Sequence, residues 1–347
     1  MSTYQKRSHP AHLHPLLSSS PPKNLLWITD PWDTLDHPKD TTLRLIQEGA
    51  RMGLKQSWCD VKSIRLENGK ILLNSYSIIQ VLEERRAGDF QFEELEILSP
   101  SQWSHIHYRT DPPVDQDYLY PLQLIALDLN SSSSQTQVIN PISILFSHNE
   151  KLEAFSIPEY MPETFVGCSW EQLHEFGVRL GKTVLKPLNE AQSKGIELLD
   201  WSNSSSIEKA RSKIEILSHG FKTPVLLQKY FDEIQHGETR LWYVDGDLIG
   251  VIKKLPLLHD FRVNLDRGSK LSKTSLTQEQ IHVSHRIGAD LKSKGIRLAA
   301  VDLIGCWITD FNFTSPGLIP QMEQILGQNL ASVILEKTLI TDDSITR

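Results

Sequence analysis

Residues 298–316, LAAVDLIGCWITDFNFTSP, predict two strands joined by a tight turn, and this hairpin decides how the second half of the chain folds. Side chains alternate between the two faces of a strand, so Asp310 and Asn312 share one face. A three-residue loop would place Asp302 opposite Asp310 on that face, whereas a two-residue loop would place it on the other. The loop length therefore decides whether the three polar side chains meet, and we expect them to meet.

The oxygen atoms of these three side chains suit a magnesium ion. Mg²⁺ takes oxygen ligands and usually completes its octahedron with water and substrate phosphate. Acidic residues near a hairpin are, on residue type alone, more often solvated strand ends, and this alternative stays open at this point. A metal role for Asp302, Asp310 and Asn312 therefore depends on whether other parts of the chain supply a site for phosphate.

Several cationic and polar residues could supply that site. Lys186 ends an apolar strand, where its ammonium could meet phosphate or lie in solvent, and Lys151 could begin a surface helix or bind an anion. Arg240 begins a strand, and its planar guanidinium can bind phosphate or carboxylate through two parallel hydrogen bonds. Arg262 and Asn264 lie in a basic loop that could close over an anionic substrate or remain mobile.

The composition is that of an ordinary globular protein, with 39% hydrophobic and 23% charged residues in a chain of 347. The 36 lysines and arginines against 43 acidic residues give a net charge of −7, which offers no overall footprint for nucleic acid or an anionic membrane. No apolar run reaches the roughly 18 residues that a membrane span needs. We therefore expect neither nucleic acid nor membrane as a partner.

The cysteines and the missing nucleotide motifs exclude further classes of protein. Cys59, Cys168 and Cys306 stand far apart without a CxxC spacing, so neither a disulfide framework nor a zinc site is predicted. A reducing compartment fits this pattern, and we expect a cytoplasmic protein. The chain has no GxxxxGK[ST] and no GxGxxG after a strand, which excludes a phosphate-loop ATPase and a dinucleotide-binding fold by fingerprint.

The first part of the chain predicts an open α/β sheet. Residues 1–23 are rich in Ser, Pro and His, and we expect a disordered tail. In residues 24–147, strands and helices alternate, as in open α/β sheets. The expected elements are strands at 24–29, 104–108 and 137–139, a hairpin at 61–73 turning at Asn68-Gly69, and helices at 41–52 and 116–130.

The second part predicts an α+β arrangement, with a small lid at 148–228 followed by a larger antiparallel sheet at 229–340. The expected strands are 182–188, 225–228, 239–244, 248–253, 298–304 and 307–313. The expected helices are 170–179, 207–217 and 278–293.

Taken in order, short segments of the chain resemble the bacterial glutathione synthetases, a family of carboxylate–amine ligases with the ATP-grasp fold. The resemblance covers roughly residues 24–340, and each segment is common alone, whereas their order along the chain is specific. The segments are ITDP at 28–31, KDTT at 39–42, RTDPP at 109–113, NEKL at 149–152, PET at 162–164, LKPL at 185–188, GETR at 237–240, RVN at 262–264, DLIG at 302–305 and NFTSP at 312–316.

The resemblance implies ATP and Mg²⁺, or Mn²⁺ in its place, and it implies roles for individual residues. Residues matching the family's nucleotide-binding positions are Lys151 and Lys186 at the phosphates and the segment Gln228, Lys229, Tyr230 and Phe231 at adenine. Asp302, Asp310 and Asn312 match the metal ligands. Arg240, Arg262 and Asn264 match groups that face the γ-phosphate and the acyl substrate. Asp30, Arg109 and Ser315 lie in segments that approach the peptide substrate.

The resemblance also implies the reaction. A substrate carboxylate attacks the γ-phosphorus of ATP to give an acylphosphate, and an amine then displaces phosphate to form an amide. The specific expectation is γ-glutamylcysteine plus glycine, so the partners are small-molecule or short-peptide substrates. By the same resemblance we expect a homo-oligomer, either a dimer or a tetramer.

Three departures from the family keep other functions open, and one of them is the loop LDRGS at 265–269, which stands where the family has a glycine-rich closure. Residues 189–195, NEAQSKG, hold one glycine where the family has a glycine-rich turn over the phosphates, and Lys194 could compensate with its charge. Asp310 stands where the family usually has the longer Glu. The alternatives are a divergent ATP-grasp protein that binds nucleotide or peptide without turnover, and a ligase for another acyl donor.

Overall fold

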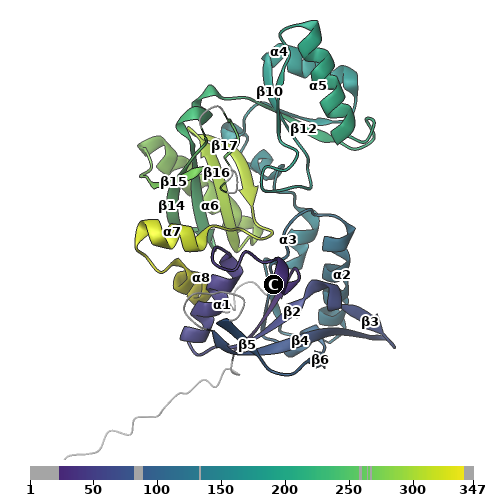
Figure 1. The fold of residues 1–347 in the computed structure, drawn as a ribbon, viewed down its shortest axis with the longest axis vertical. Coiled ribbons are helices and arrows are strands. Elements are labelled where there is room, and N and C mark those ends of the chain that lie inside the picture. Colours follow the sequence, from purple (N-terminus) through teal and green to yellow (C-terminus); the bar gives the residue numbers. More distant parts are fainter. Residues whose placement is uncertain are drawn as a thin grey trace, which may run out of the picture.

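The computed structural model describes residues 23–81, 89–132, 134–257, 260–263, 265 and 268–339, and these residues form three sheets with helices packed against them (Figure 1). The disordered tail expected at residues 1–23 lies outside the described residues except for Lys23. Asn264, expected to face the substrates, lies outside them as well.

The first sheet has eight strands and confirms the open α/β arrangement. Its order is β3-β4-β2-β1-β7-β8, with β5 and β6 both pairing with β4, and the pairs β1–β2, β1–β7 and β7–β8 are parallel. The strands are β1 (Asn24–Thr29), β2 (Lys55–Asp60), β3 (Arg65–Glu67), β4 (Lys70–Val81), β5 (Phe90–Phe92), β6 (Glu96–Leu98), β7 (His105–Tyr108) and β8 (Gln137–Ile139). The helices are α1 (Thr41–Arg51), α2 (Gln116–Ser131) and α3 (Ile142–Ser147).

Local sequence signals explain where these elements begin and turn. The Asp40 side chain caps α1, because its Oδ1 accepts a hydrogen bond of 2.8 Å from a backbone amide of the first turn. Asn68 and Gly69 have φ angles of 50° and 78°, and this turn pairs Glu67 with Lys70. Positive φ at both central residues is what a type I′ hairpin turn requires, so the expected turn is confirmed, although residues 61–63 form a short 3-10 helix and the first strand begins only at Arg65.

The second sheet forms a small lid, drawn at the upper right of Figure 1. Its four strands are antiparallel in the order β11-β10-β12-β9. They are β9 (Thr164–Gly167), β10 (Lys182–Lys186), β11 (Glu197–Asp200) and β12 (Val225–Lys229), with helices α4 (Trp170–Leu180) and α5 (Ser204–Leu217). Leu173, Leu185, Trp201 and Ile214 belong to a core made of lid residues alone.

The third sheet has five antiparallel strands in the order β15-β14-β13-β16-β17. They are β13 (Glu238–Val244), β14 (Asp247–Leu255), β15 (Lys270–Lys273), β16 (Leu298–Ile304) and β17 (Trp307–Asn312). Helix α6 (Gln278–Lys294) precedes β16, and α7 (Ile319–Leu326) and α8 (Leu330–Thr338) follow β17.

Two hydrophobic cores join the first sheet to the third. One contains Ile28 of β1 together with Phe311 of β17, and the other contains Trp27 of β1 together with Ile46 of α1 and Ile334 of α8. Helices α1 and α8 lie side by side (Figure 1). Because both cores take side chains from distant parts of the chain, they hold the loops of the two sheets in a defined relative position.

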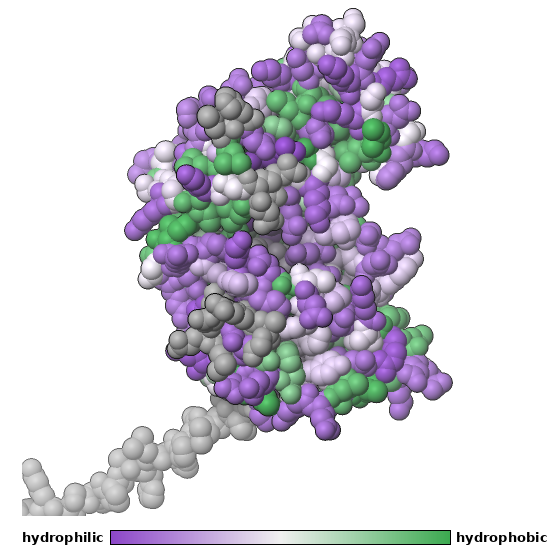
Figure 2. All heavy atoms as spheres, viewed as in Figure 1, coloured by the Kyte–Doolittle hydropathy of each residue, from purple (hydrophilic) through white to green (hydrophobic). Residues whose placement is uncertain are grey.

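The surface shows hydrophobic residues in separate patches on a mainly hydrophilic face (Figure 2). In the part of the chain that the structure describes, no helix is both long and apolar enough to cross a membrane.

Candidate active site

A β-bulge in the hairpin of β16 and β17 sets the geometry of the site. The turn has two residues, because Ile304 pairs with Trp307, so the three-residue loop that would bring the acids together is wrong. The register then shifts, and Asp302 pairs with Asp310 while Thr309 is left unpaired. The bulge therefore does what the longer loop was expected to do, and it brings the two carboxylates opposite each other.

Asp302 is the centre of a buried group of charges. Arg240, its direct partner on β13, donates from Nε to Oδ1 at 2.9 Å and from Nη2 to Oδ2 at 2.7 Å. Lys254 of β14 donates to Asp302 Oδ2 at 2.9 Å and is also ion-paired with Glu238 of β13. The four side chains therefore form a satisfied network of two cations and two carboxyl groups.

The electrostatics of this network follow from burial and pairing. Burial opposes ionisation of Asp302, but Arg240 and Lys254 outweigh it and hold the pKa of its carboxyl well below the usual range. Burial also opposes the charge of Arg240, and its carboxylate partners nevertheless raise the pKa of the guanidinium. Burial raises the pKa of Glu238 despite the nearby Lys254. Asp302 is therefore a carboxylate at neutral pH.

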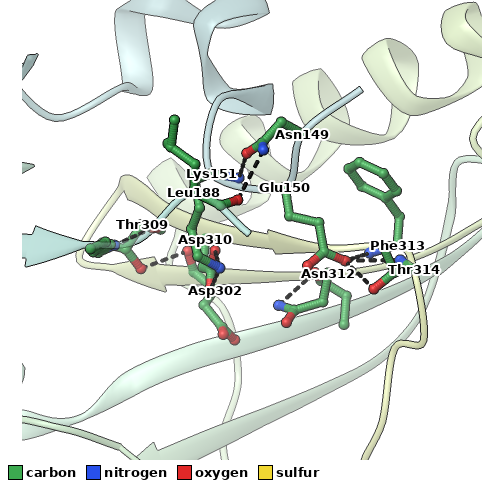
Figure 3. Close-up of polar contacts among 12 residues, drawn as sticks. Asn149, Glu150, Lys151, Leu188, Asp302, Thr309, Asp310, Asn312, Phe313 and Thr314 are labelled. Atoms are coloured by element: carbon green, nitrogen blue, oxygen red, sulfur yellow. Dashed lines mark hydrogen bonds and ion pairs between the residues drawn. The ribbon is translucent and has the colours of Figure 1, made fainter. Parts of the chain in front are cut away.

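The two lysines expected at phosphate lie beside this network. Lys151 donates from Nζ to the two carboxylate oxygens of Asp310 at 2.9 and 3.2 Å (Figure 3). Lys186 donates to the bulged Thr309 carbonyl at 2.8 Å and to Gln228 Oε1 at 2.9 Å. Burial lowers the pKa of Lys186, whereas at Lys151 the nearby carboxylates outweigh burial and raise the pKa.

A cavity of about 910 Å³, including its open mouth, brings most of the expected nucleotide and metal residues together. Its size lies in the range of pockets for small ligands and cofactors. Expected residues among its lining are Lys151, Lys186, Lys194, Gln228, Lys229, Tyr230, Phe231, Arg240, Arg262, Asp302, Asp310 and Asn312. Val184, Ile196, Ile234 and Ile304 add apolar surface to the lining, and Val184 pairs with Gln228. The cavity thus has an apolar part and a charged part, as a nucleotide would require.

Arg262 lines the same cavity but forms an ion pair with a neighbour in its own loop. Its Nε donates to Asp260 Oδ1 at 3.1 Å, and this pairing raises the pKa of the guanidinium. The loop position of Arg262 agrees with the expected basic loop.

The glycine-poor turn 189–195 also lies at this cavity. Gln192 and Ser193 have φ angles of 56° and 60°, a region that glycine adopts more readily than residues with a side chain. The turn is held to the loop between β7 and α2 by a 2.8 Å bond from Val114 N to the Asn189 carbonyl and a 3.2 Å bond from Gln192 Nε2 to Asp111 Oδ2.

A second cavity adjoins the first and contains the three residues expected at the peptide substrate. Asp30, Arg109 and Ser315 all line it. The Arg109 guanidinium is buried, donates to Thr42 Oγ1 at 3.1 Å and to the Pro316 carbonyl at 2.9 Å, and burial lowers its pKa. Ser315 Oγ donates to the Arg109 carbonyl at 3.4 Å.

Carboxyl groups give the second cavity an acidic side. Asp30 Oδ2 accepts a 2.9 Å bond from the Asp111 amide, and burial raises the pKa of both carboxyls. The two cavities share lining residues from the turn, from the charged network, from the loop of Arg262 and from β17, namely Ala191, Gln192, Ser193, Arg240, Lys254, Val263 and Asn312. A molecule in one cavity would therefore meet a molecule in the other at Arg240 and Lys254.

The oxygen-bearing side chains on β16 and β17 fit a hard divalent cation. Asp310 pairs with Asp302 and its side chain is 24% exposed toward the cavity, and Asn312 follows on the same strand face. Over the described ranges, no three His, Cys, Asp or Glu side chains form a cluster that could hold a metal. The candidate set has two carboxylates and an amide. Both carboxylates are ion-paired with lysine or arginine, and a metal would compete with these cations for the carboxylate oxygens.

Four functional candidates were missed from the sequence, namely Lys254, Glu238, Glu150 and Asp111. Lys254 follows another lysine near the end of a strand, and nothing local separates it from a solvated residue. Its register opposite Glu238 and its contact with Asp302 depend on the pairing of three strands. Asp111 and Glu150 lie within segments that resemble the family, and that neighbourhood was the available signal.

Two family models match the chain almost throughout. The prokaryotic glutathione synthetase N-terminal domain matches residues 24–145, and the prokaryotic glutathione synthetase ATP-grasp domain matches residues 150–327.

Individual proteins agree with these matches. A glutathione synthetase of Synechocystis sp. is 27% identical over 331 residues, which covers 90% of this chain and 97% of the relative. Among solved structures, a D-cycloserine synthetase aligns with a TM-score of 0.61 at 18% identity, over 89% of this chain and 99% of its own. The ATP-grasp ligase PsnB, complexed with a minimal precursor, Mg and ADP, aligns with a TM-score of 0.56 at 13% identity, over 90% and 98%. These structures show that the fold is an ATP-grasp fold over most of the chain.

Proposed function

Since the domain models of the prokaryotic glutathione synthetases match residues 24–145 and 150–327, the chain belongs to that family of ATP-dependent C–N ligases, and we propose that it joins γ-glutamylcysteine to glycine. The observation that carries this proposal is the shared boundary of the two cavities. Arg240, Lys254 and Asn312 line both of them, so the phosphate end of a nucleotide and the carboxylate of an acyl substrate would meet there.

In this proposal ATP occupies the first cavity. The 228–231 segment and the apolar residues of the lid receive adenine, while Lys151 and Lys186 bind phosphate oxygens. Both lysines are buried beside acidic or carbonyl groups, so phosphate would exchange one set of partners for another rather than meet uncompensated ammonium groups. Lys194 and the 189–195 turn cover the phosphates from the lid side.

The acyl substrate occupies the second cavity. Arg109 would bind a carboxylate, and the acidic side formed by Asp30 and Asp111 would bind an amino group. A γ-glutamyl group carries both of these charges. Ser315 and Thr314 lie at the end of β17, where the acyl chain would pass toward Arg240.

The chain's own residues would promote the reaction by orientation and by neutralising charge. Arg240, Lys254 and Arg262 would stabilise the negative charge that develops as the substrate carboxylate attacks the γ-phosphorus and as the amine displaces phosphate from the acylphosphate. A Mg²⁺ ion held by Asp302, Asp310 and Asn312 would supply further neutralisation of the triphosphate, and Mn²⁺ could take its place.

Phosphate release from ATP tests this function. We expect Mg²⁺-dependent release that requires both γ-glutamylcysteine and glycine, with glutathione identified by mass spectrometry. A panel of other amino acids and acyl peptides distinguishes a ligase with another donor or acceptor. ATP binding without release under any of these conditions would instead support the alternative function, a protein that binds nucleotide without turnover.

Three further features belong to this proposal. The domain limits are 24–147, 148–228 and 229–340, of which residue 340 lies outside the described residues. The three cysteines are all unpaired, which supports a cytoplasmic location. The third feature is a homo-oligomer, either a dimer or a tetramer, which light scattering would detect.

A further inference from the structure

Glu150 forms an unusually complete contact with the end of β17. Its Oε1 accepts hydrogen bonds from Phe313 N at 2.6 Å, from Thr314 N at 2.8 Å and from Thr314 Oγ1 at 2.9 Å (Figure 3). The residue is only 7% exposed. One carboxylate oxygen therefore satisfies three buried donors, so this contact leaves little freedom to the chain at Phe313 and Thr314.

The backbone of Glu150 makes a further contact on the other side of Asn312. The Glu150 carbonyl accepts a hydrogen bond of 3.3 Å from Phe311 N. Asn312 thus lies between two positions that the same residue holds, one through the carbonyl and one through the carboxylate. Its own Nδ2 donates to the Ala300 carbonyl at 3.4 Å, a long bond that would not orient the side chain alone.

The neighbours of Glu150 connect it to the rest of the site. Asn149 donates from Nδ2 to the Leu188 carbonyl at 2.9 Å, beside the lid strand β10. Lys151 binds the carboxylate of Asp310, two residues before Asn312. Three consecutive residues therefore contact the lid connection, the end of β17 and the acidic face of β17.

We propose that Glu150 is a positioning residue, which sets Asn312 at the distance from Asp302 and Asp310 that a bound divalent cation requires. This role deepens the proposed function and rests on its metal assignment. Partners that hold metal ligands in place typically change metal affinity by about 10- to 100-fold when they are altered, without touching the metal themselves.

Chain length and charge can be separated at this position. In Glu150→Gln the side chain keeps its length and one acceptor oxygen but loses its charge. In Glu150→Asp it keeps its charge but is one methylene shorter, so the three donors would have to move. A positioning role predicts that Asp is the harmful change, whereas a role for the negative charge predicts that Gln is.

The test is Mn²⁺ binding with a non-hydrolysable ATP analogue, followed by electron paramagnetic resonance at a temperature where every variant is folded. We expect Glu150→Asp to weaken Mn²⁺ binding by about 10- to 100-fold. We expect Glu150→Gln to stay within about twofold of the unaltered chain, the scatter for uncoupled changes. In an Asn312→Ala background the effect of Glu150→Asp should shrink to about twofold, because the ligand that it positions is gone.

Glu153→Gln is the matched control. Glu153 is a buried glutamate three residues further on, paired with Lys294 and with His148, and it lines neither cavity. Glu153→Gln removes the negative charge of these pairs, so it should lower the melting temperature and leave the Mn²⁺ affinity unchanged.

Three results would overturn the proposal. Equal losses from Glu150→Asp with and without Asn312 would show that Glu150 acts elsewhere, and a greater loss from Gln than from Asp would assign it an electrostatic role. No nucleotide-dependent Mn²⁺ binding by the unaltered chain would overturn the metal assignment of the proposed function and this role with it.

Discussion

Arg240 and Asp302 face each other across neighbouring antiparallel strands, and the guanidinium binds both carboxylate oxygens, at 2.9 and 2.7 Å. Lys254 binds the same carboxylate from the next strand. Asp302 is therefore the shared partner of two buried cations at the boundary of both cavities, and Glu238 pairs with one of them, Lys254. This relationship links the stability of the chain to the charge that the reaction needs, because the cations that would meet phosphate are held in the core of the sheet by Asp302.

The first prediction is that Asp302→Asn destabilises the chain by about 3–5 kcal/mol, because it leaves Arg240 and Lys254 without their shared counter-ion. Urea unfolding measures this loss. Phosphate or ATP should restore part of it by binding the cations that have lost Asp302. Asp247→Asn, which removes the solvent-exposed pair with Lys337, is the control and should cost at most about 1 kcal/mol. A loss no greater than that of the control would contradict the role of Asp302.

The second prediction concerns Asp310, whose side chain is partly exposed to the cavity. Asp310→Asn should lower phosphate release by at least about 100-fold, because it weakens charge neutralisation at the triphosphate. Its fold should persist, as judged by circular dichroism and the melting temperature. Asp200 is exposed on the lid strand β11 and provides the control. Asp200→Asn should release phosphate at the rate of the unaltered chain. Unchanged release by Asp310→Asn would reject its assignment as a metal ligand.

The third prediction concerns the 189–195 turn. Glycine at 190, 192 and 193 should strengthen ATP binding, because more backbone amides can approach the phosphates when no side chains intervene. Gln192 and Ser193 have positive φ, which glycine adopts more readily. The Glu190 Oε2 atom is buried without a hydrogen-bond partner in the described part of the chain. One or two recovered charge-assisted bonds of roughly 1.5–3 kcal/mol each correspond to a gain of about tenfold to about twenty-thousandfold.

Calorimetry with Mg²⁺ and ATP measures this gain. Lys194→Ala should bind ATP more weakly, because Lys194 supplies charge at the same turn. If the glycine variant binds no better and Lys194→Ala binds no worse, the turn does not meet the phosphates.

The fourth prediction is a loss of stability in acid from two histidines on β7. Burial lowers the pKa of His105 to about 4 and holds the pKa of His107 well below its usual value. Both are neutral in the folded chain, whereas the unfolded chain binds their protons below about pH 6.5. The contribution of the two histidines to the free energy of unfolding should therefore be fully present above about pH 6.5. It should fall toward pH 4, by up to about 1.4 kcal/mol per pH unit for each histidine.

Urea unfolding between pH 7 and pH 4.5 tests this prediction. His107→Phe should retain the stacking on Trp27, whose ring centroid lies 4.3 Å from that of His107, and should flatten the pH dependence. Exposed His285 gives the control His285→Gln, which should follow the unaltered chain. A His107→Phe curve as steep as that of the unaltered chain would exclude the buried histidine as a cause.

The sequence predicted elements whose signals are local. The apolar periods, the Asp40 cap and the Asn68-Gly69 turn predicted many strands and helices to within a few residues. The expected end of β4 at residue 73 was wrong, because the strand continues to Val81, and β2, α7 and α8 were not predicted. The sequence correctly predicted that Asp302 and Asp310 would lie opposite each other, but the cause is a bulge and not a longer loop. Either feature moves Asp302 to the strand face that carries Asp310. Local patterns do not distinguish them.

What the sequence missed depends on contacts between distant segments. The short strands β9 and β11 of the lid have only four residues each, too few for a clear period. Lys254 became a candidate only when β13, β14 and β16 were seen to lie side by side, and the same pairing gives Glu238, which lies in the GETR segment, its contact with Lys254. Their chemistry is a property of the sheet and not of any one segment.

The separate core of the lid has a mechanical consequence. Its contacts with the body of the molecule include hydrogen bonds from Lys186, from Val114 to Asn189 and from Gln192 to Asp111. Such bonds exchange with water at a net cost of about 0.5–1.5 kcal/mol each between neutral groups and about 1.5–3 kcal/mol where one group is charged, less than rupture of a packed core. A rigid-body tilt of the lid would therefore break bonds of this kind while both cores that join the first and third sheets stay closed.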